Sequence, residues 1–95
     1  MSDNIIKTAI MYGKQNCPNC LSAKKLLENN NYTIEYIGLD DEDARKAFYE
    51  RVAEEVKTPI MSVPQIWVNS QYIGGYQSLI EYIAVENSVK FDEEF

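Results

Sequence analysis

The chain has two cysteines, and both lie in the segment Cys17-Pro18-Asn19-Cys20. An apolar, strand-like segment precedes this motif, and a helical pattern begins at Pro18. Because proline is favoured at the first position of a helix, we expect Cys17 to be the N-cap residue. The unpaired N–H groups and the positive end of the helix then favour a thiolate on Cys17. The pattern predicts a redox pair in which Cys17 is the nucleophile and Cys20, one turn inside the helix, is the resolving thiol.

Three other roles for the cysteine pair have weaker support. A structural disulfide would close a loop of four residues, which contributes about 2 kcal/mol by chain entropy, and a reducing cytosol opposes it. A zinc site needs about four ligands, so the metal would require a second chain or an external thiol. Two buried, inert thiols are disfavoured by Pro18, which marks a helix start directly after Cys17. We therefore expect no metal site.

Composition excludes several classes of chemistry. The chain contains no histidine, which rules out a Ser-His-Asp triad, a Cys-His pair and a zinc site with histidine ligands. The net charge of -6 argues against nucleic acid or an anionic membrane surface as the main partner. Residues 1–25 carry four lysines and one aspartate, a net charge of +3, so the remainder carries -9. The positive part contains the cysteine motif.

Length and hydropathy predict a single domain over residues 1–95, with a tail at 89–95 that we expect to fray. No segment approaches the roughly 18 consecutive apolar residues of a membrane helix. The start of the chain, Met1-Ser2-Asp3-Asn4, lacks the basic and apolar regions of a signal peptide. We therefore expect a soluble, cytoplasmic protein.

The apolar pattern predicts an α/β fold with elements in the order β-α-β-α-β-β-α. The expected elements are strand 5–12, helix 18–28, strand 32–39, a helix from the acidic residues 40–43 to 56, strands 65–68 and 71–73, and a helix from about 76 to 84. A turn at Asn69-Ser70 joins the last two strands too tightly for a crossover, so they must be antiparallel. The first helix lets the first two strands run parallel. A small mixed sheet covered by helices follows.

Three motifs in this order resemble the dithiol glutaredoxins: residues 12–20 (YGKQNCPNC), 62–68 (SVPQIWV) and 72–76 (YIGGY). The resemblance covers about residues 5–86, and three ordered motifs are far more specific than one Cys-x-x-Cys pair. It implies the thioredoxin fold, with a four-stranded sheet in the order 2-1-3-4 and three helices. It also implies a thiol–disulfide oxidoreductase with glutathione as co-substrate. A ribonucleotide reductase is a familiar electron acceptor of the family, although no residue of this chain identifies it.

The resemblance also implies roles for individual residues. Cys17 and Cys20 correspond to the active-site pair. The segment Ser62-Val63-Pro64 resembles the threonine-valine-proline segment of the family, in which the proline is cis and faces the nucleophile. The backbone N–H and C=O of Val63 would then pair with the cysteinyl part of glutathione like an added strand.

The third motif implies the rest of the glutathione site. The pair Gly74-Gly75 allows a close approach of the backbone. The helix that begins at about Tyr76, Gln77 and Ser78 offers its N-terminus to the γ-glutamyl carboxylate. The family commonly has an aspartate at the position of Ser78, so we expect weaker recognition of the ammonium group of glutathione. An ordinary helix cap is the other role open to Ser78.

Two residues near the cysteines complete the expected site. Lys14 matches the basic residue that reaches the glycyl carboxylate of glutathione, with a solvated charge as the alternative. Asn19 stands where tyrosine is usual in the family, which makes that edge of the groove smaller and more polar.

The expected protein is a monomer without a tightly bound cofactor that reduces protein disulfides and glutathione mixed disulfides. Two other functions stay open. A thioredoxin-like electron donor served by a dedicated reductase is disfavoured because the tryptophan-cysteine-glycine-proline-cysteine pattern is absent. An iron–sulfur carrier, in which Cys17 of two chains and two glutathione thiols hold a cluster, is disfavoured by Pro18, since cluster-holding relatives usually have glycine there.

Overall fold

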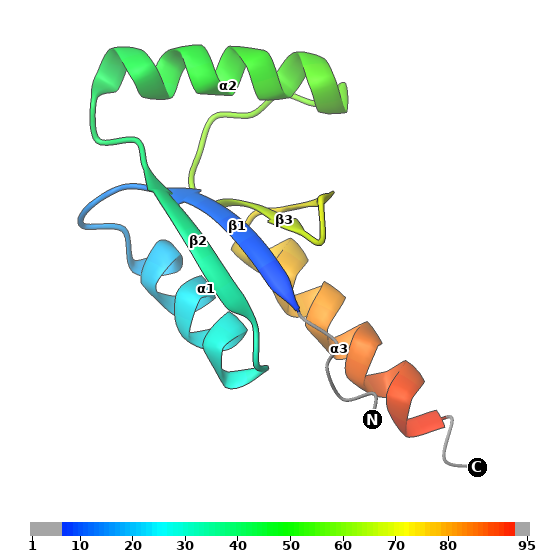
Figure 1. The fold of residues 1–95 in the computed structure, drawn as a ribbon. Helices are drawn as coiled ribbons and strands as arrows, with labels where there is room; N and C mark the ends of the chain where they lie inside the picture. The colour runs from blue at the N-terminus through cyan, green and yellow to red at the C-terminus, as the bar shows by residue number, and fades with distance from the viewer. Residues whose placement is uncertain (1–6, 93–95) are drawn as a thin grey trace.

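The computed structural model describes the backbone of residues 7–92 and the side chains of residues 7–87. Its elements follow the predicted order (Figure 1). They are β1 (Thr8–Gly13), α1 (Pro18–Asn29), β2 (Thr33–Gly38), α2 (Glu42–Val56), β3 (Gln65–Val68), β4 (Gln71–Gly74) and α3 (Tyr76–Asp92). The first predicted strand also includes Ile5 and Ile6, which lie outside the described residues.

The four strands form one mixed sheet in the order β2-β1-β3-β4, which confirms the predicted order 2-1-3-4. Strand β1 is parallel to β2 and antiparallel to β3, and β3 is antiparallel to β4. In the β3–β4 turn, Asn69 and Ser70 have φ values of 49° and 71°. Positive φ at both central residues is the geometry of a type I′ turn, so two residues suffice for this connection. Because β1 and β2 are parallel, their last residues, Gly13 and Gly38, are paired at one edge of the sheet, and the cysteine motif follows that edge.

Helices cover both faces of the sheet. Helices α1 and α3 lie side by side on one face, and α2 lies on the opposite face (Figure 1). Successive residues of a strand point to opposite faces, so Met11 of β1 packs under α1 and α3 while Tyr12 stacks on Phe48 of α2. The core under α1 and α3 consists of Ala9, Met11, Ala23, Leu27, Tyr32, Ile66, Val68, Leu79 and Ile83. The core under α2 is smaller and consists of Leu39, Phe48, Val52 and Ile60.

Helix α2 begins within the acidic run, as predicted. Asp41 is its N-cap, and the Asp41 carboxylate accepts a hydrogen bond from the Ala44 N–H at 2.9 Å. Glu42 and Asp43 occupy the first turn, where the helix dipole favours negative charge. The helix ends at Lys57, which has a φ of 59°.

Helix α3 is longer than the apolar pattern indicates. Its backbone is helical to Asp92, so residues 89–92, in the segment expected to fray, continue the helix. The rest of that segment, residues 93–95, lies outside the described residues. No helix in the described part of the chain has the length and apolar character needed to cross a membrane.

Candidate active site

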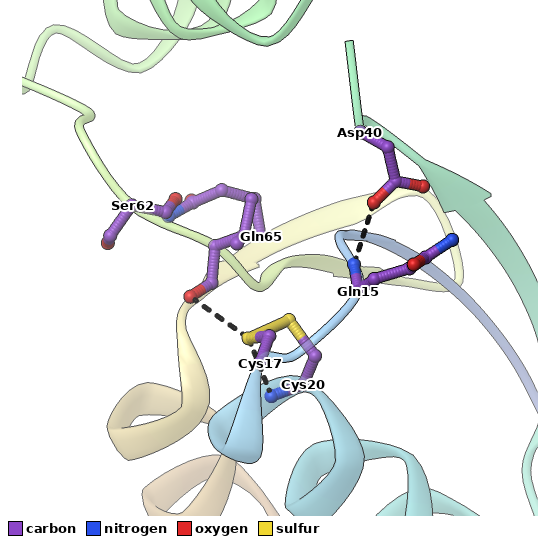
Figure 2. The surroundings of a disulfide bond; sticks show 7 residues. Gln15, Cys17, Cys20, Asp40, Ser62 and Gln65 are labelled. Carbon is purple, nitrogen blue, oxygen red and sulfur yellow. Dashed lines mark hydrogen bonds between the residues drawn. A yellow bond between two sulfur atoms is a disulfide. The ribbon is translucent and has the colours of Figure 1, made fainter. Parts of the chain in front are cut away.

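The cysteine motif forms the junction between β1 and α1. Cys17 is the N-cap of α1, with an extended backbone (φ -120°, ψ 100°), and Pro18 occupies the first turn. The Cys17 Sγ accepts a hydrogen bond from the Cys20 N–H at 3.1 Å (Figure 2). Cys17 is half-buried, whereas the side chain of Cys20 is only 5% exposed. These positions confirm the prediction that Cys17 is the N-cap residue and that Cys20 lies one turn inside the helix.

The two sulfurs form a disulfide in this structure. The Cα atoms of Cys17 and Cys20 are 5.2 Å apart, within the range that a disulfide requires. The Cys20 N–H lies 3.1 Å from the Cys17 sulfur, and a hydrogen bond to a charged acceptor is stronger than one to a neutral acceptor. The local backbone therefore favours a thiolate on Cys17 rather than on Cys20.

The end of β1 makes room for the buried sulfur. A Cβ atom at Gly13 would lie 3.0 Å from the Cys20 Sγ and 3.0 Å from Cε1 of Tyr36. Such contacts are tighter than most real Cβ contacts, so a side chain at position 13 would displace its neighbours, and glycine there lets the Cys20 sulfur approach the sheet. The sequence indicates a turn at this glycine, and only the folded chain shows the close approach.

The loop before Cys17 is held by the end of β2. The Gln15 N–H donates a hydrogen bond to Asp40 Oδ1 at 2.7 Å (Figure 2), and the Leu39 N–H donates one to the Gly13 carbonyl at 2.7 Å. Asp40 therefore fixes the approach to Cys17 from a position 25 residues along the chain. The acidic run predicts only a helix start here, so the sequence analysis missed this role.

A second loop faces Cys17. The Val63–Pro64 peptide bond is cis, as the resemblance implies. The Val63 carbonyl oxygen lies 3.9 Å from the Cys17 Sγ. The structure thus brings the cis-proline loop, residues 62–64, against the exposed side of the cysteine pair.

Two partly buried hydrogen bonds of the Gln65 side chain support this loop. The side chain of Gln65 is 4% exposed, and its Nε2 donates to the Ser62 carbonyl at 3.0 Å. Its Oε1 accepts a hydrogen bond from the Tyr72 hydroxyl at 2.5 Å. Burial raises the pKa of Tyr72 above its ordinary value, which keeps this hydroxyl a donor. The sequence analysis missed Gln65, because a glutamine in a strand carries no signal of such a contact.

The start of α3 lies beside the same loop. Gly74 has a φ of 122°, and a Cβ atom there would lie 2.9 Å from the Ser78 Oγ. A Cβ at Gly75 would meet the Pro64 carbonyl oxygen at an ordinary 3.4 Å. The first helical hydrogen bond runs from the Leu79 N–H to the Gly75 carbonyl at 3.0 Å. Gly75 is therefore the N-cap, and Ser78 lies inside the first turn rather than at the cap.

Comparison with known proteins shows which family has this site. The family model for glutaredoxin matches residues 9–73, which include both cysteines and the cis-proline loop. The chain belongs to the glutaredoxin family. Glutaredoxin 1 of Salmonella typhimurium is 34% identical over 71 residues, covering 70% of this chain and 78% of the relative. Glutaredoxin 1 of Escherichia coli is 29% identical over 79 residues, covering 78% of this chain and 89% of the relative.

Solved glutaredoxins share the fold. Glutaredoxin 1 from Francisella tularensis, complexed with cacodylate, has a TM-score of 0.78 and 30% identity, and the match covers 86% of this chain and 98% of the other. A buckwheat glutaredoxin–glutathione complex has a TM-score of 0.72 and 23% identity, with coverage of 88% and 74%. With its Cys17–Cys20 pair, the present chain is a dithiol glutaredoxin, an enzyme of thiol–disulfide exchange.

The remaining predicted residues of this glutaredoxin differ in burial and in whether they line the pocket that contains the cysteines. Lys14 is half-buried and lines a pocket that also contains Cys17 and Cys20. Tyr76 is half-buried at the start of α3, while Gln77 and Ser78 are exposed. Asn19 is exposed in the first turn of α1 and does not line that pocket.

Proposed function

We propose that this glutaredoxin reduces protein disulfides and glutathione mixed disulfides, with Cys17 as the nucleophile, Cys20 as the resolving thiol and glutathione as the reductant. The observation that carries the proposal is the position of the Cys17 sulfur, 3.1 Å from the Cys20 N–H and 3.9 Å from the Val63 carbonyl oxygen. The first contact supports a thiolate. The second lies on the backbone edge with which glutathione would pair.

In the first half of the reaction, the Cys17 thiolate attacks one sulfur of the substrate disulfide, and the other substrate sulfur leaves as a thiolate. Cys20 then loses its proton and attacks the Cys17 sulfur. The bound partner leaves with the electron pair of the broken bond, and the Cys17–Cys20 disulfide forms. This disulfide is the state that the structure contains.

In the second half, a glutathione thiolate attacks Cys17 and releases Cys20 as a thiol after protonation. A second glutathione thiolate attacks the bound glutathione sulfur, and glutathione disulfide leaves as Cys17 returns to a thiolate. Two glutathione molecules thus become one glutathione disulfide, while one substrate disulfide becomes two thiols. When the bound group is itself glutathione, the reaction needs no attack by Cys20.

The proposed glutathione site uses mainly backbone groups. The N–H and C=O of Val63, held between Ser62 and Pro64, pair with the cysteinyl part. The γ-glutamyl carboxylate lies at the N-terminus of α3, where the N–H groups that follow Gly75 lack partners within the helix. Those N–H groups belong to Tyr76, Gln77 and Ser78. A buckwheat glutaredoxin with this fold was solved as a glutathione complex, which supports glutathione as the co-substrate.

Two side chains extend the site toward the cysteines. The ammonium group of Lys14 attracts the glycyl carboxylate, since this residue lines the same pocket as both cysteines. Asn19, exposed in the first turn of α1, forms a small polar edge. We place the reaction in the cytoplasm, where glutathione is the thiol reductant, with a monomeric enzyme. Its protein partners carry disulfides, and a ribonucleotide reductase fits that description.

The proposal is tested by measuring glutathione-dependent reduction of a small glutathione mixed disulfide. Cys17→Ser removes the nucleophile and abolishes turnover. Cys20→Ser is the matched control, because it also removes the disulfide but leaves the Cys17 thiolate and its exchange with glutathione. We expect Cys20→Ser to retain substantial activity on this substrate and to lose activity on intramolecular protein disulfides. The reverse pattern would contradict the assigned roles.

A further inference from the structure

Residues 62–64 and 75–78 of the proposed glutathione site lie on one side of the cysteine pair. On the other side, the proposed glutathione site uses only Lys14. A pocket of about 250 Å³ lies there, and both cysteines are among the residues that line it. The side chains that give it its chemistry come from the β1–α1 loop, α1 and β2: Lys14, Leu21, Lys24 and Tyr36. We call these four residues the lysine flank. None of the residues 62–64 or 75–78 lines this pocket.

The lysine flank combines apolar surface with positive charge. Leu21 is 57% exposed and Tyr36 is 46% exposed, and both belong to the small set of large hydrophobic residues that the described surface leaves open. Within the described part of the chain, the residues that line the pocket include two lysines and no carboxylate. The sequence beyond residue 25 carries a net charge of -9, so the two lysines of this pocket contrast with an acidic chain. Charge of one sign next to exposed apolar groups is typical of a surface that binds a partner.

One carboxylate lies near this flank. Asp40 is close enough to Tyr36 to contribute, after burial, to the raised pKa of that phenol. However, Asp40 Oδ1 already accepts the hydrogen bond from the Gln15 N–H. Asp40 is also not among the lining residues, so the two lysine ammonium groups dominate the charge of the pocket itself.

The size of the pocket limits its occupant. Pockets for small-molecule ligands usually measure roughly 300–1,000 Å³. A volume of about 250 Å³ is sufficient for one or two side chains of a peptide. A peptide bonded through its cysteine to Cys17 would bring the neighbouring side chains to this pocket, because Cys17 is one of the residues that line it.

We propose that the lysine flank binds the residues next to the reactive cysteine of a protein substrate and selects substrates with an apolar and an acidic side chain at those positions. The apolar side chain packs on Leu21 and Tyr36. The carboxylate lies between Lys14 and Lys24. This inference deepens the proposed function, because it names the substrate class of the same cysteine pair.

The test uses two peptides that each contain an intramolecular disulfide and differ only beside one cysteine, where one has Leu-Glu and the other Leu-Lys. The rate of glutathione disulfide formation at saturating glutathione gives kcat/KM for each peptide. We divide kcat/KM for the Leu-Glu peptide by kcat/KM for the Leu-Lys peptide. This ratio removes any effect of a variant on the thiol chemistry itself. For the wild-type enzyme we expect a ratio above one that decreases toward one as salt is added, since screening weakens exposed charge pairs.

Adjacent lysines of α1 provide a matched pair of variants. Lys24 and Lys25 are both exposed, but only Lys24 lines the pocket. Lys24→Glu replaces an attraction to the glutamate of the peptide by a repulsion. The ratio should decrease roughly five- to tenfold, as expected when one exposed attraction is lost and one exposed repulsion is added. Lys25→Glu makes the same charge change outside the pocket and should leave the ratio within about twofold of wild type.

Lys24→Arg keeps the charge and should keep the ratio. Equal shifts with Lys24→Glu and Lys25→Glu would overturn the inference, because a general charge effect would then explain the preference. A wild-type ratio of one would also overturn it. Both results would leave the proposed function intact as long as the wild-type enzyme reduces the small glutathione mixed disulfide.

Discussion

The two flanks of the cysteine pair are built in different ways. The cis-proline flank, residues 62–65 and 74–78, presents backbone groups and is fixed by buried contacts: Gln65 bonds the Ser62 carbonyl and the Tyr72 hydroxyl, and Gly74 lies against Ser78. The lysine flank presents the half-buried Lys14 of the β1–α1 loop and exposed side chains of α1 and β2. The cis-proline flank is therefore part of the folded framework, whereas the lysine flank consists mainly of surface side chains.

This difference teaches how one redox centre can serve a constant co-substrate and variable partners. Backbone N–H and C=O groups are the same for every residue type, so a site made from them recognises one ligand whatever the surface sequence. Exposed side chains can change without disturbing the core, because surface substitutions usually cost less than about 0.5 kcal/mol. Substitutions of the buried residues Gln65 and Gly74 should therefore reduce stability and glutathione recognition together, whereas those of the exposed residues Leu21, Lys24 and Tyr36 should change only the choice of substrate.

Among substitutions that test the difference between the flanks, Gly74→Ala should have the largest effect. A φ of 122° is strained for any residue with a Cβ, and the new Cβ would lie 2.9 Å from the Ser78 Oγ. We expect a loss of about 2–3 kcal/mol in the free energy of unfolding and a raised KM for glutathione. Denaturant unfolding and steady-state kinetics measure both effects.

Gly75→Ala is the control for stability, since its Cβ would meet only the Pro64 carbonyl at 3.4 Å and its φ is not in the positive range. Leu21→Ala on the lysine flank should also leave the free energy of unfolding nearly unchanged, because Leu21 is 57% exposed. Equal losses in Gly74→Ala and Leu21→Ala would contradict the distinction between the flanks.

A smaller effect is expected from Gln65→Leu. This change removes two hydrogen bonds and leaves the Ser62 carbonyl and the Tyr72 hydroxyl without these partners. We expect the free energy of unfolding to decrease by about 1–2 kcal/mol and the KM for glutathione to rise, because the loop that holds Val63 loses its support. Tyr72→Phe removes only one of the bonds and should produce the smaller change on both readouts. An unchanged KM in a folded Gln65→Leu variant would show that Gln65 supports the fold and not the glutathione site.

The smallest effect is expected from Ser78→Asp. Ser78 is exposed in the first turn of α3, where a carboxylate both suits the helix dipole and offers a charge partner to the ammonium group of glutathione. The KM for glutathione should decrease about two- to fivefold, consistent with an exposed ion pair of at most about 1 kcal/mol. Ser78→Asn has the same size without the charge and should leave the KM unchanged. A decrease of equal size with Ser78→Asn would refute the role of charge.

Most of the fold could be predicted from the sequence because its signals are local. Pro18 marks the start of α1, the acidic run marks the start of α2, and the turn at Asn69-Ser70 requires an antiparallel pair. The end of α3 was harder to predict, since the helix continues to Asp92, beyond Ala84, where the apolar pattern ends. The cis-proline bond followed from the resemblance alone, because its local sequence does not distinguish cis from trans.

The supports and the second flank of the site could not be predicted in this way. Asp40 reaches Gln15 across 25 residues, and Tyr36 reaches the cysteines only because β1 and β2 are parallel and end at the same edge. Gln65 looks like an ordinary strand residue until its buried contacts are known.

The sequence by itself therefore determined the redox chemistry, because the spacing of Cys17 and Cys20 and the helix start at Pro18 act within one turn of chain. It also determined the family, through three ordered motifs. Only the tertiary structure decided what surrounds the two sulfurs. Which side chains meet at the pocket depends on strand register and helix packing, and these are set by contacts between residues far apart in the chain.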